Sequence, residues 1–184
     1  MNINVRRAQE KDLIEIKKLQ ERYNLKNISE EEKREQGFVS VETDLSLLKD
    51  IKKEGIYLAE VGTKIVGYVF PLTLEHTKKI SLLIPFIDKF SKIKYKNRNL
   101  SDYKWIIAGQ ILVDKDYKGK GIVELLWNNF IDLMKKKYEL IISEISEQNS
   151  RSLYVATKKL GLRVLEKYSA EGKNWYLVIY DLKE

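Results

Sequence analysis

The feature that most constrains this chain is a short glycine-containing loop between an apolar run and an amphipathic one. The apolar run, Trp105 to Val113, predicts a buried strand, and the pattern that begins at Ile122 predicts a helix. The loop between them contains Gly119 and Gly121. Glycine lets a backbone approach a ligand closely, and the first N–H groups of a helix have no acceptor inside it. Together with the helix dipole, this order predicts a phosphate site.

The spacing excludes two common classes of nucleotide-binding loop. A Walker loop needs two glycines separated by four residues and followed by Lys and then Ser or Thr, and the chain has neither that spacing nor the hydroxyl. A dinucleotide fingerprint needs a third glycine three residues after the second, where this chain has Glu124. The loop therefore belongs to neither class.

The segment Lys118 to Val123 instead resembles the acyl-CoA loop of the GNAT superfamily of N-acyltransferases, whose pattern is Gln/Arg-x-x-Gly-x-Gly/Ala. Two positions depart from the family pattern. Lys118 replaces the usual Arg or Gln, which keeps the charge but loses a forked donor. Val123 stands where Gly or Ala is usual, and its side chain could crowd the pyrophosphate.

The rest of the sequence predicts the element order β-α-α-β-β-β-α-β-α-β-β, which is also that of the GNAT superfamily. The predicted strands are 1–8, 56–61, 64–70, 105–113, 140–145, 162–168 and 174–182, and the predicted helices are 10–23, 43–51, 122–137 and 150–160. The resemblance implies an α/β (α+β) fold with a mixed, mostly antiparallel sheet of about seven strands flanked by helices.

The resemblance covers almost the whole chain, so we expect a single domain over residues 1–184. Residues 73–104 form an insertion between the third and fourth strands, and their apolar pattern predicts an extra helix interrupted at Pro85. This insertion could form a lid, a homodimer contact or a groove for a partner. The hairpin of the last two strands is expected to turn at Ala170 to Gly172.

Two local matches extend the resemblance. The family often carries Leu-Glu-Val-x-x-x-Asn after its fifth strand, and here Glu144, Ile145 and Asn149 stand in that register. The next helix ends at Gly161, and counting back from it puts Thr157 at the family's usual tyrosine position. Counting forward from Asn149 gives Ala156 instead, so the helix or its loop is one residue longer.

The resemblance implies acetyl-CoA (coenzyme A) as co-substrate. A backbone N–H near Ile111 would bind the thioester carbonyl, and Asn149 would bind the pantetheine amides, although Asn149 could equally cap a helix. The residues expected to bind the cofactor are Ile111, Leu112, Val113, Lys118, Gly119, Lys120, Gly121, Ile122, Val123 and Asn149.

Acyl transfer to an amine requires a neutral amine. Deprotonating a lysine side chain at pH 7 costs roughly 4.6 kcal/mol, whereas a peptide α-amine costs only about 1–1.4 kcal/mol. Glu144 is the candidate base, and its alternative is a polar residue that ends a strand or pairs with a lysine. Tyr154 and Thr157 are the candidates that protonate the leaving thiolate, and Tyr154 also fits a core aromatic side chain.

Composition limits the remaining classes of function. The chain has no cysteine and one histidine, His76, which excludes thiol catalysis and a multi-histidine metal site, and no metal is expected. His76 is expected to be a surface or structural residue. No signal peptide or membrane-spanning segment is predicted, which fits a cytoplasmic protein. The net charge of +7 suits an anionic ligand or a generally basic surface.

The segment 93–98 alternates basic residues with a tyrosine, but a solvated loop explains it better than nucleic-acid binding. The sequence thus predicts an N-acetyltransferase that moves the acetyl group from acetyl-CoA to a primary amine, on a small molecule or a protein, by direct attack in a ternary complex. The alternative is a GNAT-fold sensor or interaction module that binds acyl-CoA without turnover.

Overall fold

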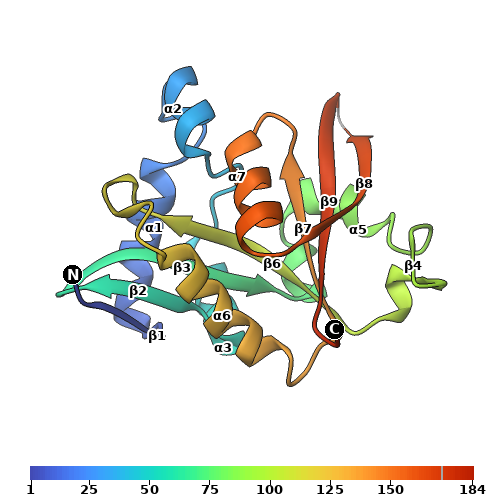
Figure 1. The fold of residues 1–184 in the computed structure, drawn as a ribbon, viewed down its shortest axis with the longest axis horizontal. Helices are drawn as coiled ribbons and strands as arrows, with labels where there is room; N and C mark the ends of the chain where they lie inside the picture. The colour runs from blue at the N-terminus through green and yellow to red at the C-terminus, as the bar shows by residue number, and fades with distance from the viewer. Residues whose placement is uncertain (171) are drawn as a thin grey trace. The chain divides into compact units, whose positions relative to one another are not determined.

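The computed structural model describes residues 1–170 and 172–184 (Figure 1), and the predicted order of the main elements is confirmed. The strands are β1 (Ile3–Arg7), β2 (Tyr57–Val61), β3 (Lys64–Leu72), β4 (Lys94–Tyr95), β5 (Arg98–Asn99), β6 (Trp105–Val113), β7 (Leu140–Ser146), β8 (Arg163–Ala170) and β9 (Lys173–Asp181). The α-helices are α1 (Leu13–Arg22), α2 (Glu30–Gln36), α3 (Leu45–Glu54), α4 (Leu74–Thr77), α5 (Ile84–Ile87), α6 (Ile122–Met134) and α7 (Ser150–Tyr154). Within the described residues, no helix has the length and apolar character needed to cross a membrane.

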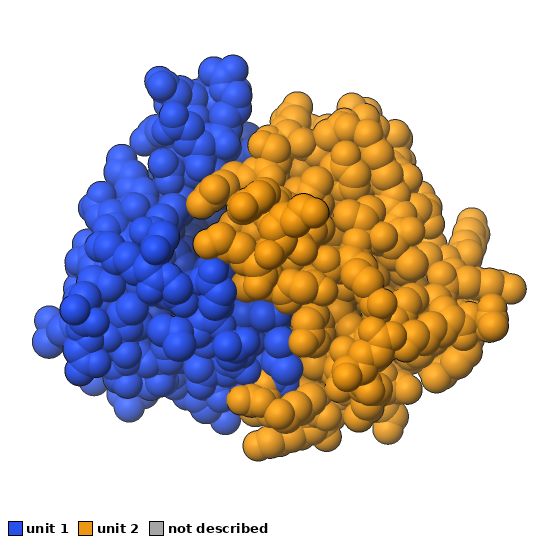
Figure 2. Space-filling view, viewed as in Figure 1, with its two compact units in different colours: residues 1–71, 109–131 blue, residues 72–108, 132–184 orange. Residues whose placement is uncertain are grey.

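The main sheet has seven strands in the order β1-β2-β3-β6-β7-β9-β8. Strands β6 and β7 pair in parallel, while β1–β2, β2–β3, β7–β9 and β8–β9 pair antiparallel. The expected mixed, mostly antiparallel sheet is therefore confirmed. The chain divides into two compact units (Figure 2): unit 1 is residues 1–71 and 109–131, and unit 2 is residues 72–108 and 132–184.

Unit 1 is built on the β1-β2-β3 meander and on helices α1 and α3. The apolar face of α1 is buried through Leu13 and Ile16, and that of α3 through Leu48 and Ile51. Asp44 caps α3 by accepting a hydrogen bond from the Leu47 N–H group at 2.7 Å.

Helix α2 was not predicted from the sequence. Ser29 and Glu32 form a capping box at its start, and Gly37 ends it with φ +72°. None of its residues is buried, so it has no apolar periodicity to detect. Its caps were the available signal.

Unit 2 contains the β8–β9 hairpin, coloured red in Figure 1, with β7 paired along β9. The turn predicted at Ala170 to Gly172 includes Glu171, which lies outside the described residues. The predicted helix break in the insertion is wrong in detail, because Pro85 stands in the first turn of α5, directly after its first residue, Ile84. Phe90 packs edge-on against both Phe86 and Trp105, with ring centroids 4.9 Å apart in each pair.

The small hairpin of β4 and β5 occupies the segment weighed for nucleic-acid binding. Lys96 and Asn97 turn it with positive φ angles of 44° and 65°. Lys96 forms ion pairs with Asp181 at 2.8 Å and Glu184 at 2.6 Å. These contacts attach the hairpin to Asp181 and Glu184.

Gly67 is where β3, β6 and α6 meet inside unit 1. A Cβ atom placed there would lie 2.8 Å from the Leu112 carbonyl oxygen and 3.3 Å from side-chain atoms of Val113 and Leu126. We expect Gly67→Ala to lower the free energy of unfolding by about 1–3 kcal/mol through overpacking, measured by urea unfolding.

Gly62→Asn is the matched control, because the Gly62 Cβ position is open and asparagine tolerates the φ of +61° found there. Its unfolding midpoint should stay close to that of the wild type. If Gly67→Ala were as stable as the wild type, β6 could shift freely, and the close approach of Gly67 to Leu112 would not fix its position.

Candidate active site

The predicted phosphate loop has the backbone conformation that its glycines require. Gly119 and Gly121 both have φ +74°, and a Cβ atom at either would meet nothing within 4 Å. The glycines are therefore needed for the left-handed backbone and not for lack of space. Helical hydrogen bonding in α6 begins with the Leu125 N–H group donating to the Gly121 carbonyl at 3.1 Å, so the preceding N–H groups have no acceptor within the helix.

The apolar residues of this segment divide into anchors and half-buried positions. Leu112, Val113 and Ile122 are buried, which fixes the end of β6 and the start of α6 in the core. Ile111 and Val123 are half-buried. Any contact of the three anchors with a ligand would therefore go through their backbone.

Lys115 and Lys118 of the loop contact α2. The Lys118 ammonium donates to the Gln36 carbonyl at 2.6 Å and to its side-chain Oε1 at 2.9 Å. Lys115 pairs with Glu32 at 3.4 Å, and both of these side chains are exposed. Lys120 donates to the Asp116 carbonyl at 3.0 Å. The loop is thus a cationic segment in contact with an acidic helix.

Sequence reasoning missed two residues that hold this loop, Asp114 and Tyr23. Asp114 is only 1% exposed, and it accepts hydrogen bonds from the Tyr23 hydroxyl at 3.1 Å and from Arg22 at 3.0 Å. The Tyr23 hydroxyl in turn accepts the Lys115 N–H group at 2.7 Å. Burial raises the pKa of Tyr23 to about 12, so the phenol keeps its proton at neutral pH. An acid directly after a buried strand was the available signal.

Glu144 lies on β7 in unit 2, half-buried and opposite Leu177 of β9. The Tyr168 hydroxyl of β8 donates a hydrogen bond to Glu144 Oε1. Tyr168 is buried, and burial together with the Glu144 carboxylate strongly raises the pKa of its phenol. The Lys89 ammonium lies 4.6 Å from the Tyr168 ring centroid. The sequence showed Tyr168 only as part of strand alternation, so this partner of Glu144 was missed.

The other predicted polar residues of unit 2 lie around α7. Asn149 is buried, and its side chain accepts the Ser152 N–H group at 3.2 Å, so it caps α7. The Thr157 hydroxyl donates to the Leu153 carbonyl at 2.8 Å. Tyr154 is 51% exposed and is therefore not a core residue.

A π-helical turn lies in the helix where the two counts differ by one residue. Residues Val155–Lys159 form a π-helical turn, and the Leu160 N–H group donates to the Val155 carbonyl at 3.1 Å, five residues back. A π turn accommodates one inserted residue within a helix. This turn explains why counts from Asn149 and from Gly161 disagree by one position.

His76 has a structural role. It is buried, and its Nδ1 atom accepts the Thr73 N–H group at 3.2 Å, which completes the cap of α4. The structure thus groups the predicted residues by unit: the loop residues with Asp114 and Tyr23 in unit 1, and Glu144, Asn149, Tyr154 and Thr157 in unit 2.

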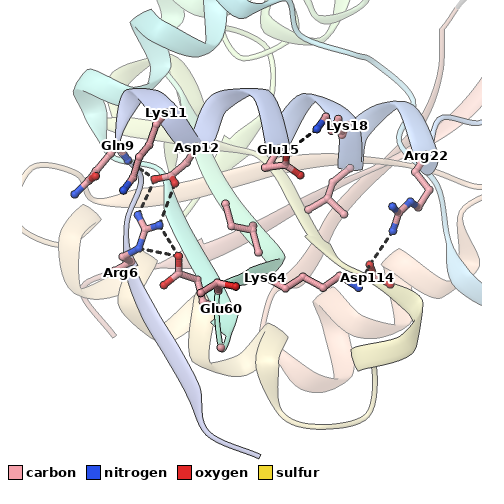
Figure 3. Close-up of a pocket in the computed structure, with 14 residues that line it drawn as sticks. Arg6, Gln9, Lys11, Asp12, Glu15, Lys18, Arg22, Glu60, Lys64 and Asp114 are labelled. Atoms are coloured by element: carbon pink, nitrogen blue, oxygen red, sulfur yellow. Dashed lines mark hydrogen bonds and ion pairs between the residues drawn. The ribbon is translucent and has the colours of Figure 1, made fainter.

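A separate polar pocket of about 550 Å³ opens in unit 1 along α1 and the β2–β3 hairpin (Figure 3). Arg6 contacts Asp12 at 2.7 Å and Glu60 at 2.9 Å, and Arg22 reaches Asp114. Among the described residues that line it, none was predicted for catalysis or cofactor binding. The ion pairs of Arg6 with Asp12 and Glu60 in this pocket join β1, the start of α1 and β2.

The Arg6–Asp12 pair should make stability depend on pH. The hydrogen bonds from Arg6 hold the pKa of the nearly buried Asp12 carboxyl below its usual range. A lowered folded-state pKa means that the stabilisation is present above about pH 4 and is lost as pH falls through the folded value. We expect Asp12→Asn to cost about 1.5–3 kcal/mol at pH 7 and to lose less stability than wild type below pH 4.

The measurement is urea unfolding at several pH values between neutral and acid. The matched control is Glu75→Gln, which removes the exposed Glu75–Lys78 pair and should leave stability unchanged at high salt. Parallel pH curves for wild type and Asp12→Asn would contradict the prediction.

Comparison with solved structures shows what this fold is similar to. The chain is 13% identical to yncA from Salmonella typhimurium, solved with its cofactor acetyl-CoA, with a TM-score of 0.64 and coverage of 100% of this chain and 96% of that one. It is 12% identical to the ribosomal-protein-S18-alanine N-acetyltransferase from Escherichia coli, with a TM-score of 0.62 and coverage of 98% of this chain and 94% of that one. It is 13% identical to NAA60 of Arabidopsis thaliana, solved in complex with acetyl-CoA, with a TM-score of 0.64 and coverage of 98% of this chain and 99% of that one.

Identities this low show a common fold and nothing finer. A search of curated protein sequences finds no match. The sequence model of the Acetyltransferase (GNAT) family matches residues 19–162, which include the phosphate loop, Glu144 and Asn149. The chain therefore belongs to the GNAT acetyltransferase family, whose members use acetyl-CoA.

Proposed function

We propose that this protein is an N-acetyltransferase that transfers the acetyl group of acetyl-CoA to a primary amine by direct attack in a ternary complex. The observation that carries the proposal is the exposed loop with two left-handed glycines and three lysines at the start of α6. It offers backbone N–H groups, a helix dipole and positive charge to a pyrophosphate. Residues 1–184 would act as one catalytic domain with 73–104 as an insertion.

The cofactor would run from this loop along the end of β6. The N–H groups of Lys118 to Val123 would hold the pyrophosphate, and the backbone of Ile111 to Val113 would bind the pantetheine and the thioester carbonyl. Asn149 already accepts a backbone N–H group as a helix cap, and its amide would bind pantetheine in addition. Free amine and acyl-CoA are the expected ligands.

Glu144 would act as the general base that takes a proton from the amine, directly or through water. The Tyr168 hydrogen bond supports this role, because it fixes the carboxylate in one orientation. Thr157 already donates its hydroxyl proton to a backbone carbonyl, which leaves exposed Tyr154 as the better candidate to protonate the thiolate. Positioning supplies much of the rate, because a thioester is already activated.

The cofactor site is tested by titrating CoA and acetyl-CoA calorimetrically into wild type and Gly121→Glu. We expect micromolar binding by the wild type and a loss of about a hundredfold in the variant. The new side chain would be strained at φ +74° and would repel the pyrophosphate.

Gly172→Glu is the matched control, because Gly172 has φ +71° and equally open surroundings. It carries the same change of charge and backbone strain outside the loop, so CoA should bind as in the wild type. A wild type that binds no CoA would refute the proposed function. Equal losses of CoA affinity in both variants would show that the loop is not the cofactor site.

The base is tested by measuring acetyl transfer to polyamines, lysine and peptides with a free N-terminus. We expect Glu144→Gln to lower kcat by about 10²–10⁴-fold while CoA binding is retained. The loss should be larger for a lysine side chain than for an α-amine, because lysine is harder to deprotonate.

Glu147→Gln is the control for this test, since Glu147 is an exposed neighbour that pairs with Lys167. It should retain wild-type turnover. Full activity in Glu144→Gln would exclude that residue as the base. Tight CoA binding by a wild type that acetylates no amine would favour the alternative of an acyl-CoA sensor.

A further inference from the structure

We propose that Tyr23 is the positioning residue of the phosphate loop and that its contacts set the affinity for CoA. The proposal rests on the proposed function, because it concerns the same cofactor site. Tyr23 is the C-cap of α1, and the GNAT loop pattern does not predict a role for it. Its role follows from what it contacts in unit 1.

Tyr23 touches the loop at three places. Its hydroxyl donates to Asp114 Oδ1 at 3.1 Å and accepts the Lys115 N–H group at 2.7 Å. The Lys118 ammonium lies 5.8 Å from the centroid of its ring. One buried side chain, only 5% exposed, thus contacts the first, second and fifth residues of the segment that leads to Gly119.

Asp114, which accepts the hydrogen bond from the Tyr23 hydroxyl, is itself held in place by several contacts. Its backbone N–H group donates to the Val66 carbonyl at 2.8 Å, which continues the contact of β6 with β3. Its carboxylate accepts the Asp116 N–H group at 3.3 Å, and the Lys64 ammonium lies 3.6 Å away. Figure 3 shows Arg22 reaching the same carboxylate from α1. A buried charge is stable only when it is paired, so these contacts hold the start of the loop in one place.

This arrangement matters for binding because a loop with two glycines is costly to order. A site whose N–H groups are already in place avoids that entropy when the ligand arrives. Without the Tyr23 hydroxyl, the Lys115 N–H group and the Asp114 carboxylate would both lose a partner. Part of the ordering would then have to occur during binding, so affinity would fall by more than the change in fold stability explains.

The test compares Tyr23→Phe with Tyr68→Phe. Tyr68 is a fully buried tyrosine of the same unit whose hydroxyl donates to Gln110, away from the loop. Each variant therefore deletes one buried hydroxyl with little change in shape. CoA affinity is measured by calorimetry, and amide hydrogen exchange is followed in peptides that cover residues 113–124.

We expect Tyr23→Phe to bind CoA about tenfold more weakly and to exchange faster across 113–124. Tyr68→Phe should keep CoA affinity within about twofold and leave exchange in that peptide unchanged. Asp114→Asn, which keeps the shape but removes the charge, should reproduce both effects of Tyr23→Phe.

Each outcome decides the proposal. If the wild type binds CoA and Tyr23→Phe binds it equally well, Tyr23 does not position the loop and only this inference is overturned. Equal losses of affinity and stability in the two tyrosine variants would overturn it as well, because they indicate general destabilisation. A wild type that binds no CoA would overturn the proposed function together with the inference.

Discussion

The carboxylate of Asp114 is almost completely buried at the point where the central strand ends and the phosphate loop begins. A charge in that position must be paired, and the available partners come from α1, the start of β3 and the loop itself. Meeting this requirement brings the Tyr23 hydroxyl and the Lys115 N–H group together. Satisfying this buried acid therefore fixes the first residues of the loop, Asp114 to Asp116.

The contacts of the loop lysines explain how the same segment can hold a ligand of opposite charge. The Lys115–Glu32 pair joins two exposed side chains, and such pairs contribute little to stability. Lys118 donates to the backbone and side-chain carbonyl oxygens of Gln36, which are neutral acceptors. A pyrophosphate offers a stronger partner than either, because charge-assisted hydrogen bonds are stronger than neutral ones.

Much of the fold was predictable because its signals are local. The strand 105–113 and the start of α6 were assigned from apolar patterns and two glycines, and both bounds agree with the structure. Helix α2 was missed because it buries no residue, and the roles of Tyr23 and Tyr168 were missed because each depends on a partner at least 24 residues away. The π turn was anticipated only as a mismatch of one residue between two counts. The spacing of apolar residues shows which face of a helix or strand is buried. Which side chains pair across different elements depends on how the chain folds.

Within the proposed reaction, Tyr168 also bears on the acceptor. A hydrogen bond donated to an ionised carboxylate stabilises the charged form and makes it a weaker base. Such a base is poorly matched to a lysine side chain, whose deprotonation at pH 7 costs roughly 4.6 kcal/mol, and better matched to a peptide α-amine, which costs about 1–1.4 kcal/mol. As part of the proposal, we expect an acceptor amine that is partly neutral at physiological pH to be acetylated more readily than a lysine side chain.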